Sequence, residues 1–190
     1  MKREPHIAKL PITTMVARSS CPICTALREF QSSLIKHLAP EDCRHFCNAH
    51  AWVAANGTPA EAIATIFLKA ITDPEWTPAS PVPEQCDVCR KMHKEKERRL
   101  DEIAEQFREP RSRSWLHDYG MLCSRHGREV ALKLPENSQK SLQELMARNS
   151  AEIAEILEDF LQEVKKGSHA GGGVLGRAAE FLVAQRGIES

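Results

Sequence analysis

Eight cysteine and histidine residues occur as four short pairs with the spacing of metal ligands. The pairs are Cys21-x-x-Cys24, Cys47-x-x-His50, Cys86-x-x-Cys89 and Cys123-x-x-His126. Along the chain, a Cys-x-x-Cys pair is followed by a Cys-x-x-His pair, and this order occurs twice. Three thiolates and one neutral imidazole are the ligand set of a closed tetrahedral zinc site, which leaves no position for water or substrate. The pattern therefore predicts two structural Zn²⁺ sites.

Pairs that are neighbours in the sequence are expected to share an ion. The first predicted site combines Cys21 and Cys24 with Cys47 and His50, and the second combines Cys86 and Cys89 with Cys123 and His126. Residues i and i+3 lie on one face of a helix or tight turn, so each pair can act as a two-pronged clamp. The intervals at residues 25–46 and 90–122 are long enough for a helical excursion whose two ends the metal would join.

The clamps are expected at helix starts, where unpaired N–H groups carry partial positive charge and favour thiolates. A zinc ion with three thiolates and one imidazole has one formal negative charge. Basic side chains near the second predicted site are expected to offset that charge; they are Arg90, Lys91, Arg125 and Arg128.

Other chemistry remains open for the same cysteines. An iron–sulfur cluster with one histidine ligand is an alternative to zinc. The Cys21-Pro-Ile-Cys24 stretch also resembles a glutaredoxin-type redox pair, although such pairs occur in a βαβ setting and this chain is nearly all helical in pattern. The seventh cysteine, Cys43, is either an additional or exchange ligand for the first site or a small buried residue.

Composition indicates a globular protein. Of the 190 residues, 42% are hydrophobic and 27% are charged, and no apolar run approaches the ~18 residues of a membrane span. The N-terminus has no apolar signal region, so a cytoplasmic location is expected, where clustered thiols more often bind metal than form disulfides. Because the net charge is zero, nothing global directs the chain to nucleic acid. The basic run Arg90–Arg99 alternates with glutamates, and a nucleic-acid-binding regulator using it is retained only as an alternative.

Helical periodicity and chain-breaking residues predict an all-α helical bundle built from two related metal-bound units. Five segments are expected: an extended N-terminal arm at 1–20, a first helical unit at 21–71, a Pro-rich linker at 72–85, a second helical unit with a long helix at 86–166, and a Gly-rich joint with a C-terminal docking helix at 167–190.

Several stretches together resemble an uncharacterised prokaryotic family of helical proteins, a domain of unknown function. They are LPIT before CPIC, then CNAHAW, CDVC, GMLCSRHG and RAAEFLVAQRG. The resemblance implies a shared metal-binding core at the same eight ligands and brings no activity with it. The residues themselves show no activated nucleophile, no general-base pair beside an open site and no nucleotide loop. We therefore expect a non-enzymatic binding or scaffold module whose partner is unknown.

Overall fold

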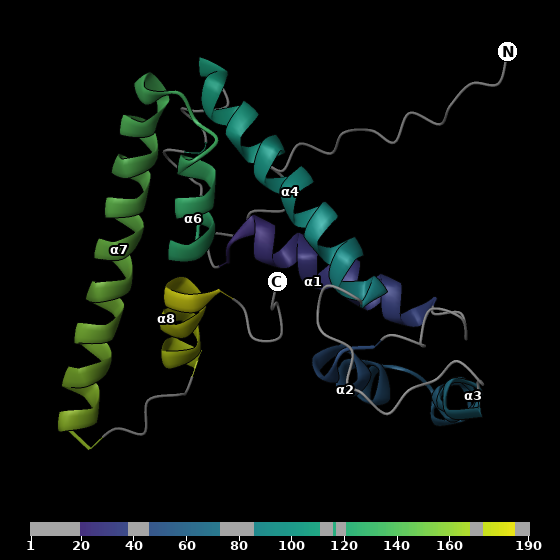
Figure 1. Ribbon diagram of the computed structural model, residues 1–190. Coiled ribbons are helices and arrows are strands. Elements are labelled where there is room, and N and C mark those ends of the chain that lie inside the picture. The colour runs from purple at the N-terminus through teal and green to yellow at the C-terminus, as the bar shows by residue number, and fades with distance from the viewer. Residues whose placement is uncertain are drawn as a thin grey trace, which may run out of the picture. The chain divides into compact units, whose positions relative to one another are not determined.

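The computed structural model describes residues 20–37, 46–72, 86–110, 116, 121–167 and 173–184, and these ranges contain helices and no strands. The named helices are α1 (Pro22–Lys36), α2 (Asn48–Gly57), α3 (Ala60–Thr72), α4 (Asp87–Arg108), α6 (Ser124–Ala131), α7 (Glu136–Lys165) and α8 (Gly173–Val183) (Figure 1). The predicted all-α fold class is confirmed. None of the described helices combines the length and apolar character needed to cross a membrane.

Contacts divide the chain into two units. Among the described residues, unit 1 consists of 20–25 and 100–184, and unit 2 of those within 26–99. The division falls after Thr25 in α1 and after Arg99 in α4. Each unit contains one complete cluster of candidate metal ligands.

In unit 1, helices α6 and α8 both contact the long helix α7 (Figure 1). A cluster of apolar side chains joins α7 to α8; it contains Met121, Ile153, Ala178 and Phe181, with Met146 and Leu157 packed against it. Helix α6 approaches α7 at Gly127, where an added Cβ would lie 2.6 Å from Met146 Sδ. The glycine therefore allows the close approach that fixes α6, and with it the neighbouring His126.

The turn between α6 and α7 is tied to the C-terminal part of α4. Lys133 Nζ lies 2.9 Å from Asp101 Oδ1, and Arg108 Nη2 donates to the Lys133 carbonyl at 2.8 Å. At the other end of α7, Gly167 adopts a φ of 81°, a left-handed conformation that ends helices at low steric cost in glycine. The start of α7 is thus positioned by contacts of the preceding turn with α4, and its end by the conformation of Gly167.

In unit 2, helices α2 and α3 contact each other and bury small and branched side chains. The buried positions are Ala54, Ile63, Ile66 and Ala70. The periodicity of α3 also predicts that Ile71 is buried, but its side chain is 60% exposed. An i, i+3, i+4 pattern identifies the apolar face of a helix, but it does not show how far along that face a neighbouring helix packs. Ile71 lies in the last turn of α3, which ends at Thr72.

Some sequence predictions lie outside the described residues. They include the N-terminal arm up to residue 19, the linker at 73–85, Cys43 and the joint at 168–172. Gly173, from the predicted glycine joint, is the first residue of α8. The predicted segment boundaries therefore stay predictions.

Candidate metal centres

Each of the four ligand pairs lies at the start of a helix. The first cysteine of each pair directly precedes α1, α2, α4 or α6, and its carbonyl accepts the first helical hydrogen bond, at distances of 2.8–3.0 Å; the donors are the N–H groups of Thr25, Ala51, Arg90 and Gly127. The second ligand, three residues on, is in the first turn. The expected position of the clamps at helix starts is confirmed, and it directs partial positive charge at every candidate site.

The structure combines the pairs differently from the prediction. Site A contains Cys21, Cys24, Cys123 and His126, and site B contains Cys47, His50, Cys86 and Cys89. The first pair in the chain therefore meets the fourth, and the second meets the third. The predicted grouping of sequence neighbours is wrong, although all eight predicted ligands take part. Residues 21–71 do not contain a complete set of four ligands.

Site A brings α1 and α6 together within unit 1. The His126 Nδ1 atom lies 3.5 Å from Cys21 Sγ, 3.3 Å from Cys24 Sγ and 3.2 Å from Cys123 Sγ. The sulfurs of Cys24 and Cys123 are 3.8 Å apart. All four side chains are buried, so the donor atoms are largely removed from solvent.

Site B brings α2 and α4 together within unit 2. The His50 Nδ1 atom lies 3.3 Å from Cys47 Sγ, 3.6 Å from Cys86 Sγ and 3.2 Å from Cys89 Sγ. The sulfurs of Cys47 and Cys89 are 3.6 Å apart. Cys89 is half-buried and the other three ligands are buried, so Cys89 is the more accessible ligand of this site.

Both donor sets fit one tetrahedral ion. With Zn–S near 2.3 Å and Zn–N near 2.0 Å, tetrahedral angles place two sulfurs about 3.8 Å apart and a sulfur and a nitrogen about 3.5 Å apart. The observed sulfur–sulfur separations are 3.6 and 3.8 Å, and the sulfur–nitrogen separations run from 3.2 to 3.6 Å. The same imidazole atom, Nδ1, faces the sulfurs in both sites, so the two sites share one ligand geometry.

Without a cation, three of these thiols have shifted pKa values, those of Cys21, Cys86 and Cys89. Burial raises the pKa of Cys21 to about 12, and burial together with the adjacent thiols also raises the pKa of Cys89. Burial acts in the same direction at Cys86, but hydrogen bonds from His50 and from the Cys47 and Cys89 backbones outweigh it and lower the Cys86 pKa to about 6. A divalent cation would displace the remaining protons and compensate the thiolate charge.

The outward nitrogen of each histidine also has a polar neighbour. Within unit 2, His50 Nε2 lies 3.3 Å from the buried Gln31 amide nitrogen. If Nδ1 binds metal, Nε2 carries the proton, so the Gln31 amide must present its carbonyl oxygen, which a half-turn of that amide provides. Within unit 1, His126 Nε2 lies 4.0 Å from Glu129 Oε2. A hydrogen-bonded partner orients a metal-binding imidazole and raises its basicity; Gln31 is close enough for this role at site B, whereas Glu129 lies beyond hydrogen-bond distance of His126.

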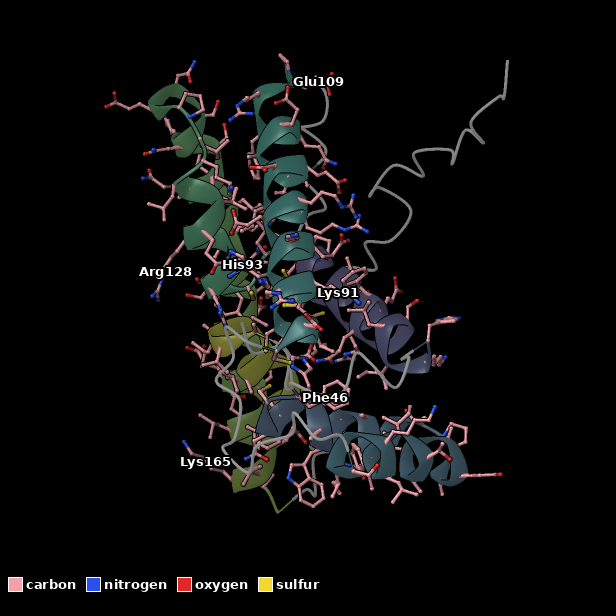
Figure 2. The ribbon with its side chains drawn as sticks, turned by 45° about the vertical axis from the view of Figure 1, so that its right-hand side comes forward. Phe46, Lys91, His93, Glu109, Arg128 and Lys165 are labelled. Carbon is pink, nitrogen blue, oxygen red and sulfur yellow. The ribbon has the colours of Figure 1, made fainter. Side chains whose placement is uncertain are left out.

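The basic residues expected near the second predicted site divide between the two observed sites. Arg90 is in the first turn of α4, beside site B, and forms an ion pair with Asp87. Arg125 and Arg128 are on α6, beside site A; Arg125 lies 3.8 Å from Glu129. Arg128 is exposed and points away from its helix (Figure 2). Arg90 and Arg125 are thus each near a carboxylate of their own helix, which reduces the positive charge that they offer to the sites.

Three residues beside the sites are absent from the sequence prediction. Glu129 follows His126 by three positions, and this i, i+3 spacing is a signal from which it could have been found. Gln31 and Arg177 gave no such signal because they come from other helices. Arg177, on α8, lines a cavity together with Cys21, Cys24 and Cys123.

Comparison of the chain with protein-family models, curated proteins and solved structures finds no match. The resemblance to an uncharacterised prokaryotic family stays a prediction. A function is therefore inferred from the ligand geometry itself.

Proposed function

We propose that this protein is a non-enzymatic zinc protein that binds two Zn²⁺ ions and presents its helices as a binding or scaffold module. The observation that carries the proposal is the convergence, twice, of three thiols and one imidazole nitrogen within 4.8 Å of one another. Zinc prefers this ligand type and needs no redox partner or assembly machinery. A protein with such thiolate ligands functions best in a reducing compartment, and we propose the cytoplasm.

A structural role follows from the ligand count. Catalytic zinc sites keep one coordination position for water or substrate, whereas four protein ligands close the coordination sphere. The sites also join helix starts that are far apart in the sequence, with Cys24 and Cys123 separated by 99 positions. Metal binding of this kind contributes directly to folding free energy. The proposed contribution of zinc is therefore to hold each unit together.

Elemental analysis of the purified protein tests the proposal. We expect about two zinc ions per chain, no visible absorption, and loss of helical circular dichroism when a strong chelator removes the metal. Adding zinc back should restore the signal. A protein isolated without metal that keeps its full helical signal would contradict the structural role.

The iron–sulfur alternative has less support from the geometry. In a [4Fe–4S] cluster each cysteine binds a different iron, and in a [2Fe–2S] cluster the four ligands are divided between two irons, so ligands of different irons lie farther apart than ligands of one ion. In each site the histidine Nδ1 lies within 3.6 Å of all three sulfurs, which fits a single ion better. Brown colour or visible absorption in the protein as isolated, or a reversible disulfide on oxidation, would favour this alternative.

The nucleic-acid alternative depends on the basic run in α4. In that run Arg98 and Arg99 both form ion pairs with Glu95, and Lys96 is buried. Internal pairing reduces the charge that these residues offer to phosphate. Binding to DNA or RNA that weakens steeply with salt would revive this alternative.

A further inference from the structure

Helix α8 closes one side of site A. It contributes Arg177, Glu180 and Phe181 to a cavity whose other wall includes the thiols of Cys21 and Cys24, and Cys123 also lines it. Phe181 belongs to the apolar cluster that joins α8 to α7. Apolar packing therefore places the Arg177 side chain beside the ligands.

The Arg177 guanidinium is only partly satisfied there. Its Nη2 lies 3.4 Å from Glu152 Oε1 on α7, and the side chain as a whole is 35% exposed. Its Nε atom, in contrast, is buried and has no hydrogen-bond partner among the described residues. Leaving a charged donor buried and unpaired costs free energy. A hydrogen-bond acceptor for Nε is therefore expected when the site holds its metal ion.

The loaded metal centre would supply that acceptor. A divalent ion with three thiolates and one imidazole has one formal negative charge, and thiolate sulfurs accept hydrogen bonds. The Glu180 carboxylate lines the same cavity and adds negative charge to it. Arginine is always protonated in proteins, so Arg177 brings a permanent positive charge to a place where metal loading creates negative charge.

We propose that Arg177 is a positioning residue for the site A metal centre: its Nε–H donates to a thiolate of the loaded site, and its charge offsets that of the metal–thiolate complex. This inference depends on the proposed function. A hydrogen bond lowers the basicity of a thiolate, so the sulfur is harder to protonate or alkylate. Arg177 therefore slows metal loss from site A, and it couples the docking of α8 to metal loading.

The test compares Arg177→Gln, Arg177→Lys and Arg128→Gln in the zinc-loaded full chain. Arg128→Gln removes one positive charge beside the same site from an exposed side chain bonded to Ser124, so it is the matched control. Each protein is mixed with a chelator and a maleimide, and mass spectrometry follows the labelling of each cysteine. The site B cysteines serve as an internal reference for stability.

We expect site A cysteines in R177Q to react about 10–100-fold faster than in the wild type, with site B unchanged. R177K should react more slowly than R177Q because it keeps the charge, and R128Q should resemble the wild type. Equal labelling of R177Q and R128Q would refute the inference. An equal acceleration at both sites would also refute it, because that result indicates general destabilisation.

A measurement on the wild-type protein keeps the test valid if R177Q does not fold. After exchange of zinc for an NMR-active cadmium isotope, a scalar coupling between cadmium and the Arg177 Hε proton should be detected through the N–H···S hydrogen bond. An Arg177 Hε that exchanges rapidly with water and shows no coupling would refute the hydrogen bond. A protein that binds no zinc refutes the proposed function, whereas a two-zinc protein without this coupling refutes only the role of Arg177.

Discussion

The nested pairing of the ligands can be tested with two matched substitutions, Cys123→Ser and Cys47→Ser. Each residue precedes a helix, and the Cys123 sulfur accepts a hydrogen bond from the His126 N–H. Serine keeps a good N-cap at either position, so each substitution removes a soft metal ligand while the helix start is preserved. The two variants damage different sites; they also differ in that the Cys123 side chain makes a cap hydrogen bond, whereas the Cys47 side chain does not.

The expected loss can be estimated from the ligand count. Structural zinc sites bind with an apparent free energy of about 10–16 kcal/mol, so one of four ligands accounts for roughly 2.5–4 kcal/mol. This corresponds to roughly 10²–10³-fold weaker zinc binding at the damaged site. A chelator of intermediate affinity should then remove one zinc ion from each variant and leave the other bound.

Cysteine labelling reveals which site has lost its ion. In C123S we expect rapid alkylation of Cys21 and Cys24, although Cys24 is 99 positions from the substitution. Cys86 and Cys89 should stay protected. In C47S the pattern should be reversed. The pairing in sites A and B would be refuted by the opposite result, in which C123S exposes Cys86 and Cys89 and C47S exposes Cys21 and Cys24. That result would show that sequence neighbours share an ion.

Cys43→Ser should retain about two zinc ions per chain, because both sites have four ligands without Cys43; loss of one ion on elemental analysis would make Cys43 a ligand. Gln31→Ala should weaken zinc binding at site B about 10-fold or more, whereas Gln31→Glu keeps an acceptor for His50 and should not weaken it. Chelator competition measures the zinc affinity of both variants. Equal affinities of the two variants would contradict a role for the contact between Gln31 and His50. Because burial raises the Cys21 pKa to about 12, a metal ion must displace the Cys21 proton at neutral pH. The zinc affinity of site A should therefore rise from about pH 6 to 8, with proton release measurable by calorimetry. An affinity independent of pH would contradict this prediction.

The ligands and their positions at helix starts were predictable because both are local properties. A Cys-x-x-Cys or Cys-x-x-His pair contains its own geometry within one turn. Pro22 follows Cys21 directly and is the first residue of α1, a position that proline favours. No distant part of the chain is needed to place these features.

The surroundings of each metal site were less predictable because they depend on packing between helices. Arg177 meets site A only because Ala178 and Phe181 pack α8 into the apolar cluster of unit 1. The same limit explains the exposure of Leu161 and Val164, at 53% and 46%, on the apolar stripe of α7. Periodicity gives the direction of a face, whereas the length over which it is covered depends on the neighbouring helix.

The pairing of the clamps was not predictable from their distances along the chain, and chain entropy explains why. The loop from Cys24 to Cys123 spans 99 positions, roughly four times the spacing from Cys24 to Cys47. Since each doubling of loop length adds only about 0.6 kcal/mol, the longer closure costs about 1.2 kcal/mol more. That difference is small beside the ~10–16 kcal/mol of a structural zinc site.

Nesting reduces even this small difference. Site B joins Cys47 to Cys89, which are 42 positions apart, and this loop lies entirely within the one that site A closes. Once site B has formed, its loop is tied off, and the free chain that site A must still close is shorter. The entropic preference for sequence neighbours is therefore weak, and the packing of the helices that carry the clamps decides which pairs share an ion.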